Sequence, residues 1–278
     1  MTNKPIVFFH LGIERTATTY LQDAVFPHFK NIGYIHKRHY ADATAIISQQ
    51  KYKHYLVSYE LNLNEQFERE VRNFSSIYPH AIPIMVLRPQ AQWLVSQYKR
   101  FVKNGNPQPF HRFFNLQNRD SLYPTQALLY THRIELLKNY FTTNPLLFFY
   151  HDFRQQPQQF IQQLAHTVNA TVHLSDINSQ KIHTSYTTQQ LLALQYVMQY
   201  INLKRERKFR QPLLHFGHRL AKDAVRYTTF AIANQLPAHW FEEQAFISSE
   251  TLNAITQYYQ DDWNTCLQYI NPTSFQNP

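Results

Sequence analysis

The chain has 278 residues, of which 44% are hydrophobic and 15% are aromatic. This composition supports a sizeable buried core, and it excludes a chain kept disordered by charge, because only 16% of the residues are charged. The formal net charge of +9 indicates an anionic partner, which could be a nucleotide, an acidic glycan, an anionic lipid or a nucleic acid.

The amino-terminal residues and the cysteine content give expectations about the compartment. The first residues, MTNKPIVFFHLGIERT, lack the features of a signal peptide, and no apolar run reaches the ~20 residues of a membrane span. The single cysteine, Cys266, excludes an internal disulfide, and its apolar helical surroundings predict a buried thiol. We therefore expect a cytoplasmic protein, with membrane association left open.

Four short apolar runs predict the buried strands of a parallel sheet. They are IVFFHL near residue 6, HYLVSY near 54, IPIMVL near 82 and PLLFFY near 145. Because helix-compatible stretches separate them, the pattern predicts an α/β fold with a doubly wound, P-loop-like sheet flanked by helices. From about residue 187 the pattern is helical. We expect one domain over residues 1–278, with a core at 1–195 and a helical extension at 196–278.

The loop after the first predicted strand has the composition of an anion site. Gly12 ends an apolar run, Arg15 supplies a cation, and hydroxyl groups follow at Thr16, Thr18 and Thr19. A helix beginning here would direct backbone N–H groups and its dipole toward a bound anion. An ordinary strand–turn–helix with threonine caps is the alternative. A Walker A loop is excluded, because the second glycine and the lysine of that motif are missing.

This loop resembles the phosphosulfate-binding loop of sulfotransferases, which in many bacterial and carbohydrate members reads H-x-G-x-x-K-T-G-T-T-x-L-Q. The matching residues are His10, Gly12, Thr16, Thr18, Thr19, Leu21 and Gln22. The resemblance implies that the loop binds the sulfate donor 3′-phosphoadenosine 5′-phosphosulfate (PAPS). Arg15 stands at the family's lysine, and Ala17 stands at its loop glycine. These two differences bear on catalytic efficiency more than on donor binding.

A second stretch resembles the part of the family that binds the donor's 3′-phosphate. Arg88 follows the third predicted strand, at the end where open α/β sheets bind ligands, and Ser96 and Tyr98 lie on the next predicted helix. The resemblance implies that these three residues contact the donor. More weakly, KIHTSYTTQQLLAL resembles the loop that closes over the nucleotide, which adds Lys181 and Ser185 to the predicted donor site.

Sulfuryl transfer also needs a group that accepts the proton of the acceptor hydroxyl. Glu60 ends the second predicted strand, and the resemblance to carbohydrate sulfotransferases implies that it is the base. His10 is the other candidate, although its match to the family loop favours a structural role. Glu14 could orient Arg15 instead. No metal is expected, because the 15 histidines are scattered, and HFGH at 215–218 is better explained as a solvated helix face.

Residues 203–226 combine many cations with an apolar side. Acceptor docking, a membrane-surface helix, nucleic-acid contact and a solvated charged face all remain open for this region. We expect an acceptor such as a carbohydrate or lipid-linked glycan, no nucleic acid, and peripheral membrane contact as one option.

Rival functions are a sulfotransferase fold that binds PAPS or its product PAP without turnover, and a basic nucleic-acid- or membrane-binding protein. A P-loop kinase or NTPase lacks its loop lysine and its Mg²⁺-binding aspartate.

Overall fold

The computed structural model describes residues 4–61, 65–117, 121–177, 186–204, 206, 209–241 and 246–269. These residues form two compact units, each built from separate stretches of the chain. The first unit comprises Met1–Gln90, Gln126–Ile182 and Tyr259–Pro278, and the second comprises Ala91–Thr125 and His183–Tyr258. The last helix of the expected extension therefore belongs to the first unit. The expectation of a single domain stays a prediction.

The first unit contains a five-stranded sheet in which every pairing is parallel, with the order β2-β3-β1-β4-β5. Its strands are β1 (Ile6–Ile13), β2 (Gly33–Ile35), β3 (His54–Leu61), β4 (Ile82–Leu87) and β5 (Leu146–Phe149). The α/β class and all four predicted strands are confirmed. The edge strand β2 was not predicted, because three residues are too few to show a periodicity.

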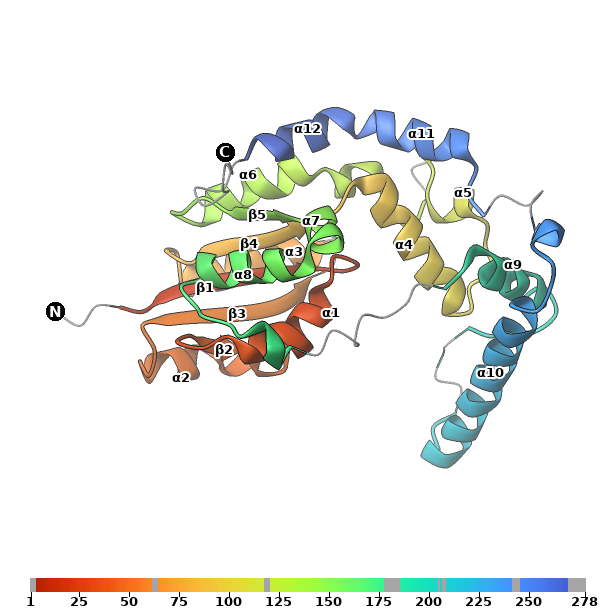
Figure 1. The fold of residues 1–278 in the computed structure, drawn as a ribbon, viewed down its shortest axis with the longest axis horizontal. Helices are drawn as coiled ribbons and strands as arrows, with labels where there is room; N and C mark the ends of the chain where they lie inside the picture. The colour runs from red at the N-terminus through yellow and green to blue at the C-terminus, as the bar shows by residue number, and fades with distance from the viewer. Residues whose placement is uncertain are drawn as a thin grey trace. The chain divides into compact units, whose positions relative to one another are not determined.

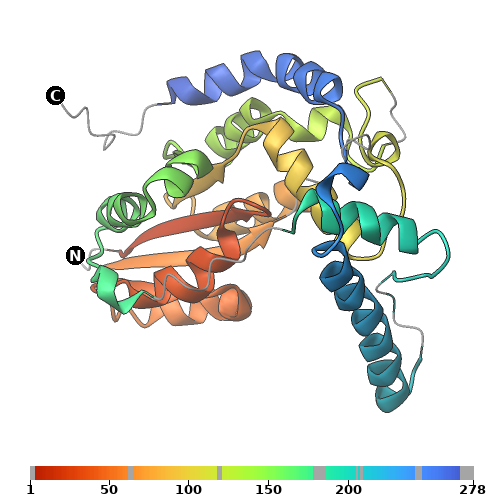
Figure 2. The same ribbon diagram turned by 45° about the vertical axis from the view of Figure 1, so that its right-hand side comes forward.

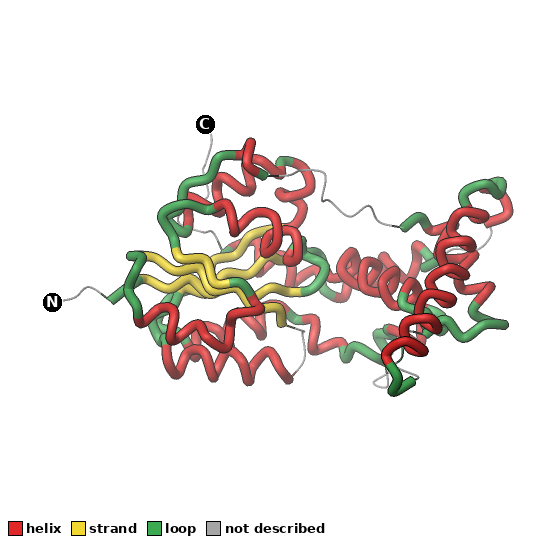
Figure 3. The backbone as a smooth tube through the Cα atoms, turned by 90° about the horizontal axis from the view of Figure 1, so that it is seen from below, coloured by secondary structure: helices red, strands yellow, loops and turns green. Residues whose placement is uncertain are grey.

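Helices cover both faces of this sheet, which Figure 3 shows as one layer of strands between helices. On one face lie α1 (Thr18–Tyr20), the π-helical turn Leu21–Val25, the 3-10 turn Phe26–His28, α7 (Tyr150–Gln155) and α8 (Pro157–Thr167). On the other lie α3 (Glu65–Ile77) and α6 (Tyr130–Tyr140), with α12 (Gln260–Gln268) packed on α6. Shorter elements are the 3-10 turns Lys37–Asp42, Thr125–Leu128 and Leu174–Asp176, and α2 (Ala43–Ser48).

Successive side chains of a strand pack against the helices on opposite faces of the sheet. On β1, Phe8 packs into the cluster that holds Leu21 and Phe160, whereas the neighbouring Phe9 stacks on Phe74 of α3 at 3.9 Å between ring centroids. A strand buried on both faces reads as a continuous apolar run, which is why these segments were recognisable in the sequence.

The second unit is helical in its described residues. Its helices are α4 (Gln90–Lys103), which begins at the last residue of the first unit, α5 (Phe110–Phe113), α9 (Thr188–Val197), α10 (Pro212–Ala233) and α11 (Ser249–Tyr258), with a 3-10 turn at Ala238–Phe241. Thr187 caps α9 in a capping box with Gln190, as its position in the sequence predicts. Pro212 stands in the first turn of α10, where its missing N–H costs no hydrogen bond.

Within the first unit, Asp262 links α12 to the first turn of α6. Its carboxylate accepts hydrogen bonds from Gln90 Nε2 at 2.6 Å, from the backbone N–H of Tyr130 at 2.9 Å, and from both the N–H and the hydroxyl of Thr131. The two N–H groups belong to the first turn of α6, which has no side-chain cap of its own. Asp262 is only 7% exposed, so it satisfies donors that water does not reach.

We predict that Asp262→Asn lowers the free energy of unfolding by about 2–4 kcal/mol, because an amide NH₂ would face buried donors in place of an acceptor oxygen. Urea denaturation followed by circular dichroism measures this. The matched control is Asp261→Asn on the exposed neighbouring position, which should change stability by less than about 0.5 kcal/mol. Equal effects of the two substitutions would contradict the role of Asp262.

Candidate functional site

The site lies at the carboxyl ends of the parallel strands. The strand order places β1 between β3 and β4, so the loop Glu14–Ala17 begins beside the ends of both neighbours. Gly12 is paired with Glu60 in the register of β1 and β3, and Arg88 follows directly after β4. Gly12 and Arg15, Glu60, and Arg88 come from three separate stretches of the chain and therefore meet at one edge of the sheet.

Gly12 permits the close approach of the loop to the strand. A Cβ atom at this position would lie 2.3 Å from Cγ2 of Thr18 and 3.1 Å from the carbonyl oxygen of Tyr59. Any side chain here would push the start of α1 away from β1. The glycine is required by packing between strand and helix, which agrees with its place in the motif.

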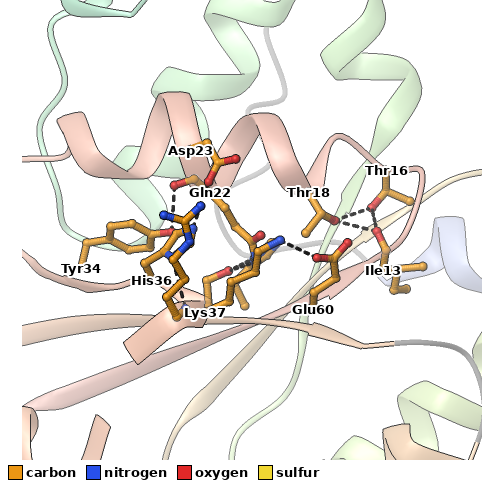
Figure 4. A network of polar contacts seen from close by, with 12 residues as sticks. Ile13, Thr16, Thr18, Gln22, Asp23, Tyr34, His36, Lys37 and Glu60 are labelled. Atoms are coloured by element: carbon orange, nitrogen blue, oxygen red, sulfur yellow. Dashed lines mark hydrogen bonds and ion pairs between the residues drawn. The ribbon is translucent and has the colours of Figure 1, made fainter. Parts of the chain in front are cut away.

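Thr16 and Thr18 hold the loop in shape. The hydroxyl of Thr16 donates to the carbonyl oxygen of Ile13 at 2.7 Å, and that of Thr18 donates to the same oxygen at 2.6 Å (Figure 4). Both side chains are buried, and each hydroxyl proton is used inside the loop. Donation by these two hydroxyls to an anion stays a prediction, and Thr19 and Arg15 are exposed.

Two residues of the loop adopt left-handed backbone conformations. Arg15 has φ 65° and Ala17 has φ 64°. For a residue with a side chain this conformation costs about 1–2 kcal/mol, which glycine avoids. The strain at Ala17 explains physically why a glycine suits this position. The helix that follows is a short α segment, Thr18–Tyr20, continued by the π-helical turn Leu21–Val25.

Arg88 and Arg15 are held together despite their like charges. Nη1 of Arg88 donates to the carbonyl oxygen of Arg15 at 3.3 Å, and the guanidinium lies over the ring of Tyr150, 4.6 Å from its centroid. The hydroxyl of Tyr130 donates to the carbonyl oxygen of Arg88 at 2.8 Å and fixes its backbone. Within the described residues, Nε of Arg88 is buried and has no hydrogen-bond partner.

The charges around Arg88 make this a site of excess positive charge. Burial lowers the pKa of its guanidinium; Tyr150 opposes that shift, whereas Arg15 and Arg154 add to it. No carboxylate is among its electrostatic neighbours in the part of the chain that the structure describes. Since an arginine stays charged in proteins, an anion bound here would relieve the repulsion.

Glu60 lies where the sequence predicts, at the end of β3 beside the loop, but it has an unexpected partner. Nζ of Lys37 lies 2.5 Å from Oε2 of Glu60, and both side chains are partly exposed. Lys37 opens the 3-10 turn after β2, so sequence analysis missed it together with that strand. Lys37 is thus a third cation on this edge of the sheet, after Arg15 and Arg88.

His10 lies beneath the loop rather than in the site. It is fully buried, and its Nδ1 is 2.8 Å from Oγ of Ser58, which also accepts a hydrogen bond from Gln22 Nε2. Burial lowers the pKa of His10 to about 3, so the imidazole is neutral. An acceptor in solution has no access to it, which favours the structural role over that of a base.

Other predicted residues are placed differently. Ser96 and Tyr98 are buried on α4 in the second unit. The hydroxyl of Tyr98 donates to the carbonyl oxygen of Gln108 and accepts from Gln195 Nε2, contacts that account for it without a ligand. A shared role of Ser96 and Arg88 stays a prediction. Lys181 and Ser185 lie outside the described residues.

Among the described residues, no three histidine, cysteine, aspartate or glutamate side chains gather as metal ligands would. In the same part of the chain, no helix combines the length and the apolar character needed to cross a bilayer.

The chain matches no family model and no curated protein. Among solved structures it is similar to a sulfotransferase from Alicyclobacillus acidocaldarius, at 13% sequence identity and a TM-score of 0.48. The similarity covers 69% of this chain and 91% of that protein. A likeness this distant carries no argument about chemistry, which has to come from the residues themselves.

The burial of His10 predicts a pH dependence of stability. Its folded pKa lies below the ordinary value of 6.5, so below that pH the unfolded chain binds a proton that the folded protein does not. The stabilisation is complete above about pH 6.5 and is lost as the pH falls toward the folded pKa, by about 2 kcal/mol at about pH 5. Urea denaturation across this range should show a shallower pH dependence for His10→Gln.

Ser58→Ala is the control. It removes the hydrogen bond to His10 but leaves the ring buried, so it should lower stability at every pH and keep the wild-type slope. A wild-type slope in His10→Gln would show that His10 is not the titrating group.

Proposed function

We propose that the chain is a PAPS-dependent sulfotransferase whose donor lies across the carboxyl ends of β1 and β4. The observation that carries this proposal is the convergence of Arg15 and Arg88, whose positive charges repel each other. Among the described residues, no carboxylate is an electrostatic neighbour of Arg88. A donor carrying a 5′-phosphosulfate and a 3′-phosphate supplies anions for both. The motif around Gly12 supports the same choice.

In this proposal the loop residues bind the 5′ end of the donor. Backbone N–H groups of the loop and the exposed Thr19 donate to the phosphate, while Arg15 donates to the sulfuryl oxygens. Arg88 binds the 3′-phosphate, with Ser96, Lys181 and Ser185 as further proposed contacts. The product left after transfer, 3′-phosphoadenosine 5′-phosphate (PAP), keeps both phosphates.

The reaction proposed is an in-line displacement at sulfur. The acceptor hydroxyl oxygen forms a bond to sulfur as the bond between sulfur and the 5′-phosphate oxygen breaks, and PAP leaves with that bonding pair. The hydroxyl proton passes to Glu60. Arg15 stabilises charge on the transferring group and the leaving phosphate, so most of the catalysis is positioning and charge stabilisation. The acceptor proposed is a carbohydrate or lipid-linked glycan.

A second candidate is a protein that binds PAPS or PAP without transferring sulfate. It is favoured by the ion pair between Lys37 and Glu60, which occupies an oxygen of the proposed base, and by the strained Ala17 in place of glycine. A screen of acceptors with labelled PAPS separates the two: transfer to any acceptor supports the enzyme, and donor binding without transfer supports the second candidate.

We predict that Arg88→Ala weakens PAP binding by about 2–4 kcal/mol, the range for a partly buried contact to a phosphate. Isothermal titration calorimetry measures it. ATP, which has no 3′-phosphate, should bind the wild type far more weakly, and the variant should lose most of this preference. The matched control is Arg72→Ala, because Arg72 is an exposed arginine of the same unit bonded to Glu68 and Tyr140. Unchanged PAP affinity in Arg88→Ala would remove the donor site from this position.

We predict that Glu60→Gln lowers turnover by about 10²–10⁴-fold, the range for a lost general base, and leaves PAP affinity near that of the wild type. Lys37→Met tests how the pair works. If Lys37 acts only by orienting Glu60, Lys37→Met should lower turnover in the otherwise wild-type protein but lower it little further in the Glu60→Gln variant. Lys37→Arg should keep most of the activity that Lys37→Met loses.

Single-turnover transfer from labelled PAPS measures these rates. Glu68→Gln, on the exposed surface of α3, is the control and should be active. Near-normal turnover in Glu60→Gln would assign the proton to another group.

A further inference from the structure

Helix α10 presents an apolar stripe to solvent. Leu213, Phe216, Leu220 and Tyr227 are 85%, 65%, 60% and 51% exposed. Their spacing of three, four and seven residues places them on one face of a helix. Between them on this face lie only small or uncharged residues, namely Gly217, Ala221, Ala224, Thr228 and Ala231, all of them exposed. Side chains of this size are normally buried, so the stripe needs an explanation.

The rotation of α10 is fixed by its other face. Lys222 donates to the carbonyl oxygen of Lys204 at 2.8 Å, and Arg226, which is fully buried, donates to that of Leu203 at 3.0 Å. Phe230 is buried one turn further on. These contacts hold the polar face toward the protein, so the apolar face cannot turn inward without breaking them.

Only the carboxyl-terminal part of α10 packs deeply. Its buried residues run from Arg226 to Ala233, and none lies between Pro212 and Val225. Figures 1 and 2 show the amino-terminal turns extending past α9. The three most exposed side chains of the stripe, Leu213, Phe216 and Leu220, thus lie on the turns that pack least on the rest of this unit.

The polar face beside the stripe carries excess positive charge. It borders a cavity of about 250 Å³ lined by Lys204, Glu206, His215, His218, Arg219, Lys222 and Asp223. Both acids of this lining are paired with cations: Glu206 with Lys204 at 2.5 Å, and Asp223 with Arg226. Asp223 also lies 3.7 Å from the exposed Arg219, so this one carboxylate faces two arginines, and the exposed Arg210 adds further positive charge.

We propose that this apolar stripe of α10 binds the surface of an anionic lipid bilayer. A helix with leucine and phenylalanine on one side and lysine and arginine on the other lies in the bilayer interface, with its apolar side among the acyl chains. The exposed cations Arg210 and Arg219 are attracted to the headgroups of anionic lipids. A second copy of this chain fits less well, because it brings the same positive charge to the contact, in a chain whose formal net charge is +9.

Co-sedimentation of the full chain with vesicles tests the proposal. Vesicles of phosphatidylcholine mixed with phosphatidylglycerol should bind the protein, and vesicles of phosphatidylcholine alone should bind it at least about 10-fold more weakly. Leu220→Gln should weaken binding to the anionic vesicles about 10-fold or more, as expected for one leucine withheld from the acyl chains.

The matched control is Leu122→Gln. Leu122 is in the same unit and 59% exposed, against 60% for Leu220, but it is not part of the stripe. It should bind vesicles as the wild type does. Circular dichroism should show an equal helix content in both variants. PAP affinity should be unchanged in Leu220→Gln, because the proposal involves no residue of the donor site.

Three results would overturn the proposal. They are equal binding to neutral and anionic vesicles, equal loss of binding in Leu122→Gln and Leu220→Gln, and absence of vesicle binding together with self-association that Leu220→Gln abolishes. The last result would assign the stripe to contact between two copies of the chain.

Discussion

The arrangement of this protein depends on holding two like charges together at the carboxyl ends of parallel strands. Arg88 donates to the backbone of Arg15, and their guanidinium groups raise each other's electrostatic energy. Neutral groups hold the pair: the ring of Tyr150 lies under one guanidinium, and the hydroxyl of Tyr130 fixes the Arg88 carbonyl. The positive charge is therefore built into the scaffold, and under the proposed function this arrangement lowers the cost of binding a polyanion.

The shape of the loop after β1 is fixed by close packing and by hydrogen bonds within the loop. Gly12 lets Thr18 approach β1, and the hydroxyls of Thr16 and Thr18 converge on the carbonyl oxygen of Ile13. These two hydrogen bonds close the loop on itself. The left-handed conformation of Ala17 is a cost of this shape that a glycine would remove. Thr16 and Thr18 thus stabilise the shape of the loop.

Helix α12, the last described helix, supports the backbone of Arg88 although it lies far from Arg88 in the sequence. Asp262 of α12 binds the first turn of α6, which begins with Tyr130, and the hydroxyl of Tyr130 binds the backbone of Arg88. A chain of direct hydrogen bonds therefore runs from α12 to the strand end. The same unit buries His10, Ser58 and Gln22 under the loop, where a neutral imidazole avoids placing another cation next to the arginines.

The sequence by itself determined the α/β class, four of the five strands, the loop with Gly12 and Arg15, and the strand-end positions of Glu60 and Arg88. These follow from local patterns: continuous apolar runs for strands buried on both faces, and polar residues where those runs stop. Only the tertiary structure decided the strand order, the edge strand β2, the pairing of Lys37 with Glu60, the burial of His10 and the anchoring of α12. Each of these depends on which residues distant in the chain come into contact, and a three-residue strand or a single lysine leaves no periodic signal in the sequence.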